Sequence, residues 1–292
     1  MTPADNLRGI GLMTASMALF GLEDMFLKFA ARDIPTGEIL LVTCLFSWAF
    51  FAALARYEGK RTFTRDALHP WVLARNAGEM VGTIAYITAL ASVPLATVSA
   101  VLQAMPLAVT MGAALFMGEK VGWRRWTAIA LGFCGVLLVI RPGMDGFSPA
   151  ALWVLVTVAG LGLRDLASRM VPPEFSTTQV SAWGVASVAL LGAGMLAFQT
   201  PVMPDWEQSG MMLGALIVGT AGYWAITSAA RTGEVSVVSP FRYSRLIFAI
   251  LLGVIAFAEF PDRLTLLGAA IIIGSGLYSF ARERARARAK RG

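Results

Sequence analysis

Residues 128–140 read AIALGFCGVLLVI, a run without one charged side chain. The run lies in an apolar segment, 123–140, that approaches the roughly 20 residues an α-helix needs to cross a bilayer. A transmembrane β-strand would alternate apolar and polar residues, whereas this run is continuously apolar. The segment is therefore predicted to be a membrane-spanning helix.

Segments of the same kind cover almost the whole chain. Hydrophobic residues make up 57% of the sequence and charged residues only 14%, whereas soluble domains carry about 25% charged residues. The charged faces of a soluble helical bundle are missing. We therefore predict an all-α polytopic membrane protein with ten transmembrane helices, at 9–31, 36–55, 71–92, 94–117, 123–140, 148–170, 177–198, 209–230, 233–258 and 264–281.

The lysines and arginines are shared unequally between the two sides of these segments. One set of alternating loops and tails holds most of the 24 basic residues, whereas the opposite loops hold only Arg32, Arg141 and Arg263. Because basic residues accumulate on the cytoplasmic side, both termini are expected in the cytoplasm. Met1–Leu7 lacks the features of a cleaved signal peptide, so the first span is expected to stay in the mature protein.

The basic tail, 282–292, and the two cysteines have simple interpretations. The tail is expected to set topology and to rest on anionic lipid headgroups, so membrane lipids are expected partners and nucleic acid is not. Cys44 and Cys134 fall inside spans and are predicted to be buried apolar residues, without a disulfide or metal role.

The ten segments divide into two halves of five. An odd number of spans per half requires the second half to be inserted upside down, which gives an inverted repeat. In the first half, an Ala- and Pro-rich span ends at Glu119 and a Gly-containing span follows; in the second half, the same order recurs around Glu259. We expect a first repeat at 1–143 and a second, inverted repeat at 144–281. The spans 123–140 and 264–281 show no polar face and are expected at the periphery or in a dimer contact.

These two glutamates, with the spans around them, resemble the drug/metabolite transporter (DMT) superfamily. The resemblance is to its EamA-type branch with ten helices, which includes the YddG amino-acid exporters, and it covers essentially the whole chain. It implies a secondary transporter of the bacterial inner (plasma) membrane that exports small metabolites through a central cavity between two inverted repeats. Either a monomer or a homodimer is compatible with it.

Polar residues within spans predict where that cavity lies. In hydrocarbon such side chains face protein or a water-filled cavity, and helical spacing places several of them on common faces. For isolated Ser, Thr and Gly residues, close helix packing is the simpler interpretation. The candidate substrate-binding residues are Glu79, Tyr86, Gln103, Trp224, Arg242 and Tyr243. The candidates for coupling or gating are Glu23, Arg164 and Arg245.

Arg242 is expected near mid-bilayer, two residues after Pro240, which should interrupt its helix. Its guanidinium could bind a carboxylate on the cargo or an acid that changes partners during transport, such as Glu79 or Glu23. A permanent ion pair that stabilises the bundle is an equal alternative. If Arg242 binds a carboxylate and Glu79 an ammonium group, the cargo is a zwitterion, which favours neutral and larger amino acids.

Spacing also predicts local ion pairs for other charges. Residues four apart on a helix can neutralise each other, and the two terminal glutamates can pair within their own turns. The expected pairs are Asp24 with Lys28, Arg75 with Glu79, Asp165 with Arg169, Glu119 with Lys120, Arg124 or Arg125, and Glu259 with Arg263.

An intramembrane enzyme is the rival from another class, but the sequence offers no catalytic motif. The single histidine, His69, lies at the mouth of a span, and neither a His-Glu-x-x-His nor a Gly-x-Ser-x-Gly motif occurs. Neither a cofactor nor a metal is expected, and without an ATP-binding loop transport would be secondary. A channel-like or scaffold protein is a further alternative, although no repeated filter segment is visible.

Overall fold

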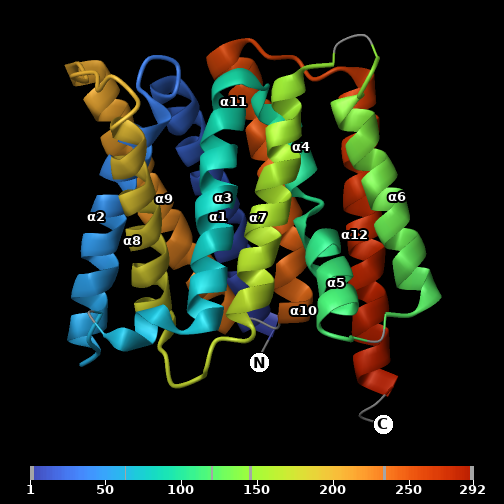
Figure 1. Cartoon of the computed structure of the whole chain (residues 1–292). Helices are drawn as coiled ribbons and strands as arrows, with labels where there is room; N and C mark the ends of the chain where they lie inside the picture. The colour runs from blue at the N-terminus through green and yellow to red at the C-terminus, as the bar shows by residue number, and fades with distance from the viewer. Residues whose placement is uncertain (1–2, 63, 120, 145–146, 233–234, 290–292) are drawn as a thin grey trace.

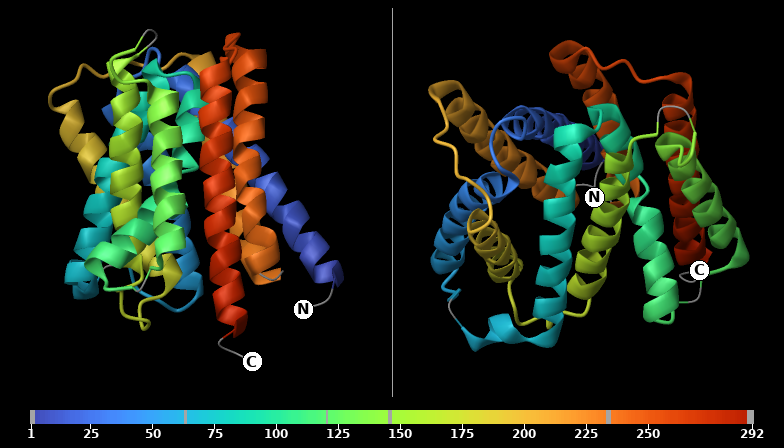
Figure 2. Two further views of the ribbon diagram at one scale, coloured as in Figure 1. Left: turned by 90° about the vertical axis from the view of Figure 1, so that its right-hand side faces the viewer. Right: turned by 45° about the horizontal axis from the view of Figure 1, so that its top comes forward.

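The computed structural model of the chain describes residues 3–62, 64–119, 121–144, 147–232 and 235–289. In these ranges all regular structure is helical, and the helices stand side by side in a bundle (Figure 1). Lys120, residues 233–234 and the end of the tail, 290–292, lie outside the described residues. Helix α1 begins and α12 ends at the same end of the bundle (Figure 2), called here the terminal end; the opposite end is the far end.

Twelve α-helices and three short 3-10 helices make up the described part of the chain. In order they are α1 (Pro3–Ala30), α2 (Thr36–Tyr57), η1 (Arg65–Leu68), α3 (Pro70–Ser92), α4 (Leu95–Leu102), α5 (Met105–Phe116), α6 (Trp123–Ile140), η2 (Pro149–Ala151), α7 (Leu152–Ser168), α8 (Thr177–Leu196), α9 (Trp206–Thr232), α10 (Val235–Val238), η3 (Ser239–Ser244), α11 (Arg245–Phe257) and α12 (Arg263–Ala289).

These helices form the ten predicted spans. Among the described residues, nine spans are long and apolar enough to cross a membrane, counting α4 with α5, η2 with α7 and η3 with α11. The tenth, α3, has 23 residues and carries Arg75 and Glu79, which make it less apolar. These two side chains pair at 2.9 Å, as the i,i+4 spacing predicts. The all-α class with ten spans is confirmed.

The closest-packed spans follow the order of an inverted repeat. In such a repeat each span of the first half corresponds to the span five places later. The pair α1–α9 then corresponds to α7–α3, while α2–α8, α6–α12 and α4–α11 each correspond to themselves. All five pairs pack against each other. The tertiary packing therefore has the symmetry that the span count predicts.

Spans four and nine are both interrupted. Between α4 and α5 the helix is broken just before Pro106. In span nine, α10 gives way at Ser239 to the 3-10 helix η3, which contains Pro240. The break predicted at Pro240 is confirmed, since proline lacks the backbone N–H and its ring crowds the preceding turn.

The two breaks touch each other at the middle of the bundle. The Gln103 side-chain amide donates a hydrogen bond of 3.1 Å to the backbone carbonyl of Tyr243, 140 positions further along the chain. Glu119 and Glu259 are separated by the same number of positions. The breaks therefore occupy corresponding places in the two repeats.

The far end of the bundle is tied together by Lys28 and Glu259. Lys28 Nζ lies 2.7 Å from Glu259 Oε1 and donates to the Val93 carbonyl oxygen at 2.5 Å. Glu259 Oε2 accepts the Leu95 backbone N–H at 2.8 Å, and α4 packs on α11. Toward the terminal end, the described residues of α5 and α10 show no comparable packing, and α5 and α10 are the lower halves of these two spans in Figure 1. Spans four and nine are thus joined at one end and separated at the other.

Several predicted local pairs are wrong because tertiary partners replace them. Lys28 pairs with Glu259 rather than with Asp24, so Glu259 does not bind Arg263. Asp165 contacts the adjacent Arg164, not Arg169. Arg169 instead reaches Glu119, whose Oε1 lies 3.2 Å from the Arg169 Nη1. Cys134 is also exposed on the outside of the bundle, contrary to the prediction that it is buried.

Helices α3 and α7 approach closely enough for their backbones to touch. A Cβ atom on Gly160 would lie 2.6 Å from the Gly82 nitrogen and 2.8 Å from the Gly82 Cα atom. Neither backbone can move without separating the helices. Small residues at such positions allow the close packing on which membrane helix association depends.

Two glycines on α7 provide a matched test of this contact. Gly160→Ala is expected to lower the melting temperature of the detergent-purified protein by several degrees, because overpacking costs about 1–3 kcal/mol. Gly162→Ala, where a Cβ would meet nothing within 4 Å, should leave the melting temperature unchanged or raise it slightly. Equal melting temperatures for the two variants would contradict the close α3–α7 contact.

Candidate functional site

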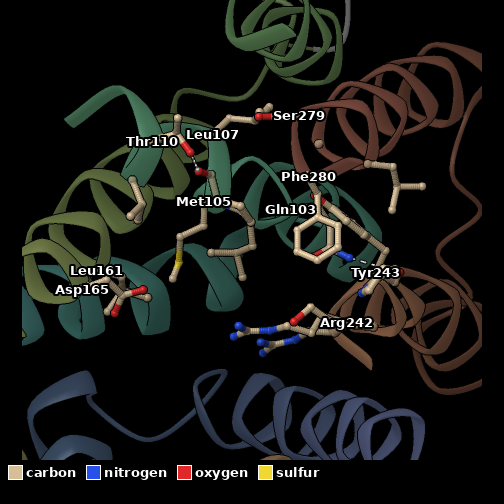
Figure 3. Close-up of a pocket in the computed structure, with 18 of the residues that line it drawn as sticks. Gln103, Met105, Leu107, Thr110, Leu161, Asp165, Arg242, Tyr243, Ser279 and Phe280 are labelled. Atoms are coloured by element: carbon tan, nitrogen blue, oxygen red, sulfur yellow. Dashed lines mark hydrogen bonds between the residues drawn. The ribbon is translucent and has the colours of Figure 1, made fainter. Parts of the chain in front are cut away.

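A cavity of about 570 Å³ lies where spans four and nine separate. Its walls come from both halves of the chain: α1, α3, α4 and α5 from the first half, and α7, α9, η3, α11 and α12 from the second half. Figure 3 shows Gln103, Thr110, Asp165, Arg242 and Tyr243 around this space. The breaks in spans four and nine thus place polar groups in the middle of an otherwise apolar bundle.

Arg242 presents an uncompensated positive charge to the cavity. Its side chain is exposed and lines the cavity wall, and it makes no ion pair with any described residue. It is carried by η3, so the irregular backbone after Pro240 directs it inward. Of the alternatives predicted for Arg242, a permanent ion pair is not observed among the described side chains.

Asp165 is a carboxylate that lines the same cavity as Arg242. It comes from α7 and faces the cavity from the opposite side in Figure 3. Its Oδ1 atom accepts from Arg164 Nε at 2.9 Å and lies 2.8 Å from Arg164 Nη2, which leaves Oδ2 without a described ion pair. The cavity therefore carries a cation and a partly satisfied anion on facing walls.

Three other predicted substrate-binding residues line the same cavity: Tyr86, Gln103 and Tyr243. The Tyr243 hydroxyl packs on Gly276 of α12, where any larger residue would displace it. The C-terminal half of α12 also contributes Phe280 to the cavity wall. The prediction that the span 264–281 lies only at the periphery is therefore wrong for this half of α12.

Arg245, predicted as a coupling or gating residue, belongs to a buried cluster at the edge of the cavity. It binds Asp24 with two of its guanidinium nitrogens, at 2.8 Å from Nη2 to Oδ2 and 3.2 Å from Nε to Oδ2. The Tyr86 hydroxyl donates to Asp24 and lies 3.0 Å from Arg245 Nη2. The Arg245 guanidinium also stacks over the ring of Phe20 at 5.5 Å. This cluster joins α1, α3 and α11.

Glu79 and Arg164 form a second cluster, outside the cavity lining. Glu79 lies 2.9 Å from Arg75 and 3.1 Å from Arg164, and Arg164 in turn binds Asp165. Two arginines and two acids therefore neutralise one another between α3 and α7. The structure does not bring Glu79 to Arg242, although the sequence groups the two residues as binding partners.

Glu23 and Trp224 also lie outside the cavity lining. Trp224 on α9 has 65% of its surface exposed. The Glu23 carboxylate lies against Gly219 of α9, where a Cβ atom would come within 2.7 Å of the Glu23 Cδ. Asp165, Arg169, Met105 and Phe280 line the cavity but were not selected from the sequence. No pattern in the sequence identifies Asp165, because its place on the cavity wall beside Leu161 depends on how α7 is rotated.

Most charged side chains in the described central parts of the spans have an ion-pair partner, but two do not. Among the described residues there, only Arg242 and Glu23 lack an ion pair. The compensated charges are Asp24 with Arg245, Lys28 with Glu259, and Arg75, Glu79, Arg164 and Asp165 together. The described residues contain no cluster of three or more side chains suited to a metal ion.

Curated relatives of the chain are transporters of different small molecules. The S-adenosylmethionine uptake transporter of Rickettsia felis is 24% identical over 95% of this chain and 94% of its own. The riboflavin transporter of Vibrio cholerae is 28% identical over 90% of this chain and 89% of its own. The pseudopaline exporter of Pseudomonas aeruginosa is 22% identical over 91% of this chain and 93% of its own.

The fold is also found in a solved crystal structure of a protein that is 22% identical. That structure has a TM-score of 0.59 and covers 98% of this chain and 99% of its own. Residues 7–141 and 148–280 each match the EamA-like transporter family. With these two matches, the inverted packing of ten spans and the central cavity, the chain belongs to the EamA-like transporter family, within the drug/metabolite transporter superfamily.

Proposed function

We propose that this transporter carries zwitterionic, amino-acid-like metabolites with an apolar side chain. Arg242 is the residue that carries this proposal. A guanidinium inside the bilayer is costly, about 2.5–3.5 kcal/mol on insertion scales, and none of the described side chains compensates it. A cargo carboxylate would supply the missing negative charge through two parallel hydrogen bonds.

Asp165 is the proposed contact for the ammonium group of the cargo. Glu79, the residue predicted for this role, is already held by two arginines at 2.9 and 3.1 Å. Asp165 faces the cavity and keeps one carboxylate oxygen without a described ion pair. An ammonium group at Asp165 and a carboxylate at Arg242 would each meet the opposite charge across the cavity.

Apolar walls between these two charges support a cargo with a hydrophobic part. Met105, Leu161, Phe280 and the ring of Tyr243 line the cavity, and Met side chains adapt readily to ligands of different shape. Neutral amino acids of medium or large size combine the two charges and the apolar part. The relative named for S-adenosylmethionine, a derivative of methionine, is compatible with such a cargo.

The closed far end supports a carrier rather than an open channel. The α4–α11 contact and the Lys28–Glu259 pair block the path beyond the cavity. A carrier must close the terminal end before it opens the far end, which is alternating access. We further propose a bacterial inner-membrane location and export as the direction, as the sequence resemblance implies, and cytoplasmic termini, as the distribution of basic residues predicts.

The proposed orientation predicts which loops an impermeant thiol reagent can reach. In a variant with Cys44 and Cys134 replaced by serine, Asp205→Cys should be labelled in intact cells, because the loop before α9 lies at the far end. Arg61→Cys should be labelled only after the cells are permeabilised. The reverse pattern would place the cavity mouth on the outside and contradict the proposed orientation.

Removal of the Arg242 charge should impair transport at normal protein levels. In proteoliposomes loaded with unlabelled phenylalanine, Arg242→Gln is expected to lower the exchange of labelled phenylalanine by about 10- to 100-fold, since hydrogen bonds to charged groups contribute about 1.5–3 kcal/mol. Arg124→Gln, whose side chain stacks on Trp123 outside the cavity, is the matched control. Normal exchange by Arg242→Gln would refute the proposed carboxylate site.

The role of Asp165 is tested by a change in selectivity. Asp165→Asn should weaken competition by phenylalanine while sparing competition by 3-phenylpropionate, the analogue without the amino group. The measurement is the concentration of each compound that halves exchange of the labelled cargo. An equal change for both compounds would show that Asp165 supports the fold and does not bind the ammonium group.

A further inference from the structure

Glu23 is a carboxyl group inside the bundle for which the described residues provide no counter-ion. It lies on α1, one residue before the buried Asp24, which is only 2% exposed. The absence of a side chain at Gly219 on α9 leaves the space that the carboxyl group occupies. No described residue donates a hydrogen bond to it. The site is therefore shaped to hold a carboxyl group but not to neutralise a carboxylate.

The surrounding charges oppose ionisation of Glu23. Asp24, its neighbour on α1, repels a second negative charge, and the Glu23 side chain is only partly exposed, so little water is available to stabilise the ionised form. Arg245 on α11 attracts it, but two of the three guanidinium nitrogens, Nε and Nη2, already donate to Asp24. If Glu23 were ionised, the carboxylates of Glu23 and Asp24 would share the single guanidinium of Arg245 in a medium of low dielectric constant.

The other elements around α1 bring no unused cation to this position. Tyr86 on α3 donates its hydroxyl to Asp24, and α9 presents Gly219. Cys44 on α2 is a free thiol and brings no positive charge either. Arg242 on η3 faces the cavity, where the proposed cargo binds. The neutral, protonated form of Glu23 needs none of these groups, whereas the ionised form does.

Glu79 provides the contrast within the same bundle. It has two arginine partners, Arg75 and Arg164, which stabilise its ionised form. Both glutamates are predicted from the sequence as acids that could change partners during transport. The ion pairs distinguish them, since only Glu23 lacks a described partner.

We propose that Glu23 is a proton-binding site, protonated in the conformation seen here, that couples proton movement to transport. This proposal rests on the proposed function, in that the coupled cargo is the one bound by Arg242. The step is a simple dissociation in which the carboxyl O–H bond breaks, the proton passes to water and a carboxylate remains. No other bond changes.

Dissociation of this proton has a direct structural consequence. The new carboxylate competes with Asp24 for Arg245, and Arg245 and Tyr86 both line the cavity. The contacts that hold α1, α3 and α11 together at the edge of the cavity are thereby weakened. Binding and release of one proton can thus favour alternate arrangements of the helices around the cargo.

Infrared spectroscopy of the purified protein tests the proton site without any cargo. Near neutral pH, the wild-type protein should show the carbonyl stretch of a protonated carboxyl group, which should disappear at alkaline pH. Glu23→Gln should lack this band, because the amide mimics the neutral form and preserves the fold. The control variant Glu38→Gln should retain the band. Glu38 lies in the first turn of α2, at the far end of the bundle, and accepts the Val202 backbone N–H at 3.0 Å.

Transport in proteoliposomes tests the coupling. An imposed pH gradient should raise the accumulation of labelled phenylalanine severalfold in the wild type and in Glu38→Gln. In Glu23→Gln the gradient should have no effect, while exchange of phenylalanine at equal pH continues.

Each result has a distinct meaning. A wild-type protein without the protonated band, or a band that persists in Glu23→Gln, overturns the proton site. An undiminished response to the pH gradient in Glu23→Gln overturns the coupling. If phenylalanine is not exchanged at all, the proposed cargo is refuted, and the coupling, which was tied to that cargo, falls with it; the infrared measurement then still decides the proton site.

Discussion

A charged side chain within a bilayer must find a counter-charge, and this requirement organises the interior of the protein. The pairs that satisfy it join the two halves of the chain: Asp24 binds Arg245, Lys28 binds Glu259, and Glu79 binds Arg164. Removal of one partner from such a pair leaves an uncompensated buried charge, at a cost of about 3–5 kcal/mol. The same interface must separate for cargo to pass, so these pairs both stabilise the bundle and restrict its movement.

The inverted repeat explains why one end of the bundle can be closed while the other is open. The halves of spans four and nine at the far end, α4 and α11, pack together, whereas the corresponding halves at the terminal end, α5 and α10, stand apart. Because the repeats have the same topology in opposite orientations, exchange of their conformations would open the far end and close the terminal end. Gln103 and Tyr243 mark the point about which this exchange would occur.

The sequence predicts the features that depend on local composition. Continuous apolar runs gave the ten spans, Pro240 gave the break in span nine, and i,i+4 spacing gave the Arg75–Glu79 pair. It failed where partners from distant helices compete with local ones. A helical i,i+4 pair contributes only about 0.2–0.5 kcal/mol. Asp24 therefore binds Arg245 through a bidentate contact and does not pair with Lys28. The position of Asp165 in the cavity also depends on how α7 is rotated, which its sequence alone leaves open.

The central claim is that the cavity between the two repeats is the cargo site and opens at the terminal end. Thr110 lines this cavity on α5, so Thr110→Cys in a background without Cys44 and Cys134 reports on access to it. An impermeant maleimide should label this cysteine faster in inside-out than in right-side-out vesicles, and phenylalanine should slow the labelling. Faster labelling from the outside, or labelling that phenylalanine does not affect, would contradict the account.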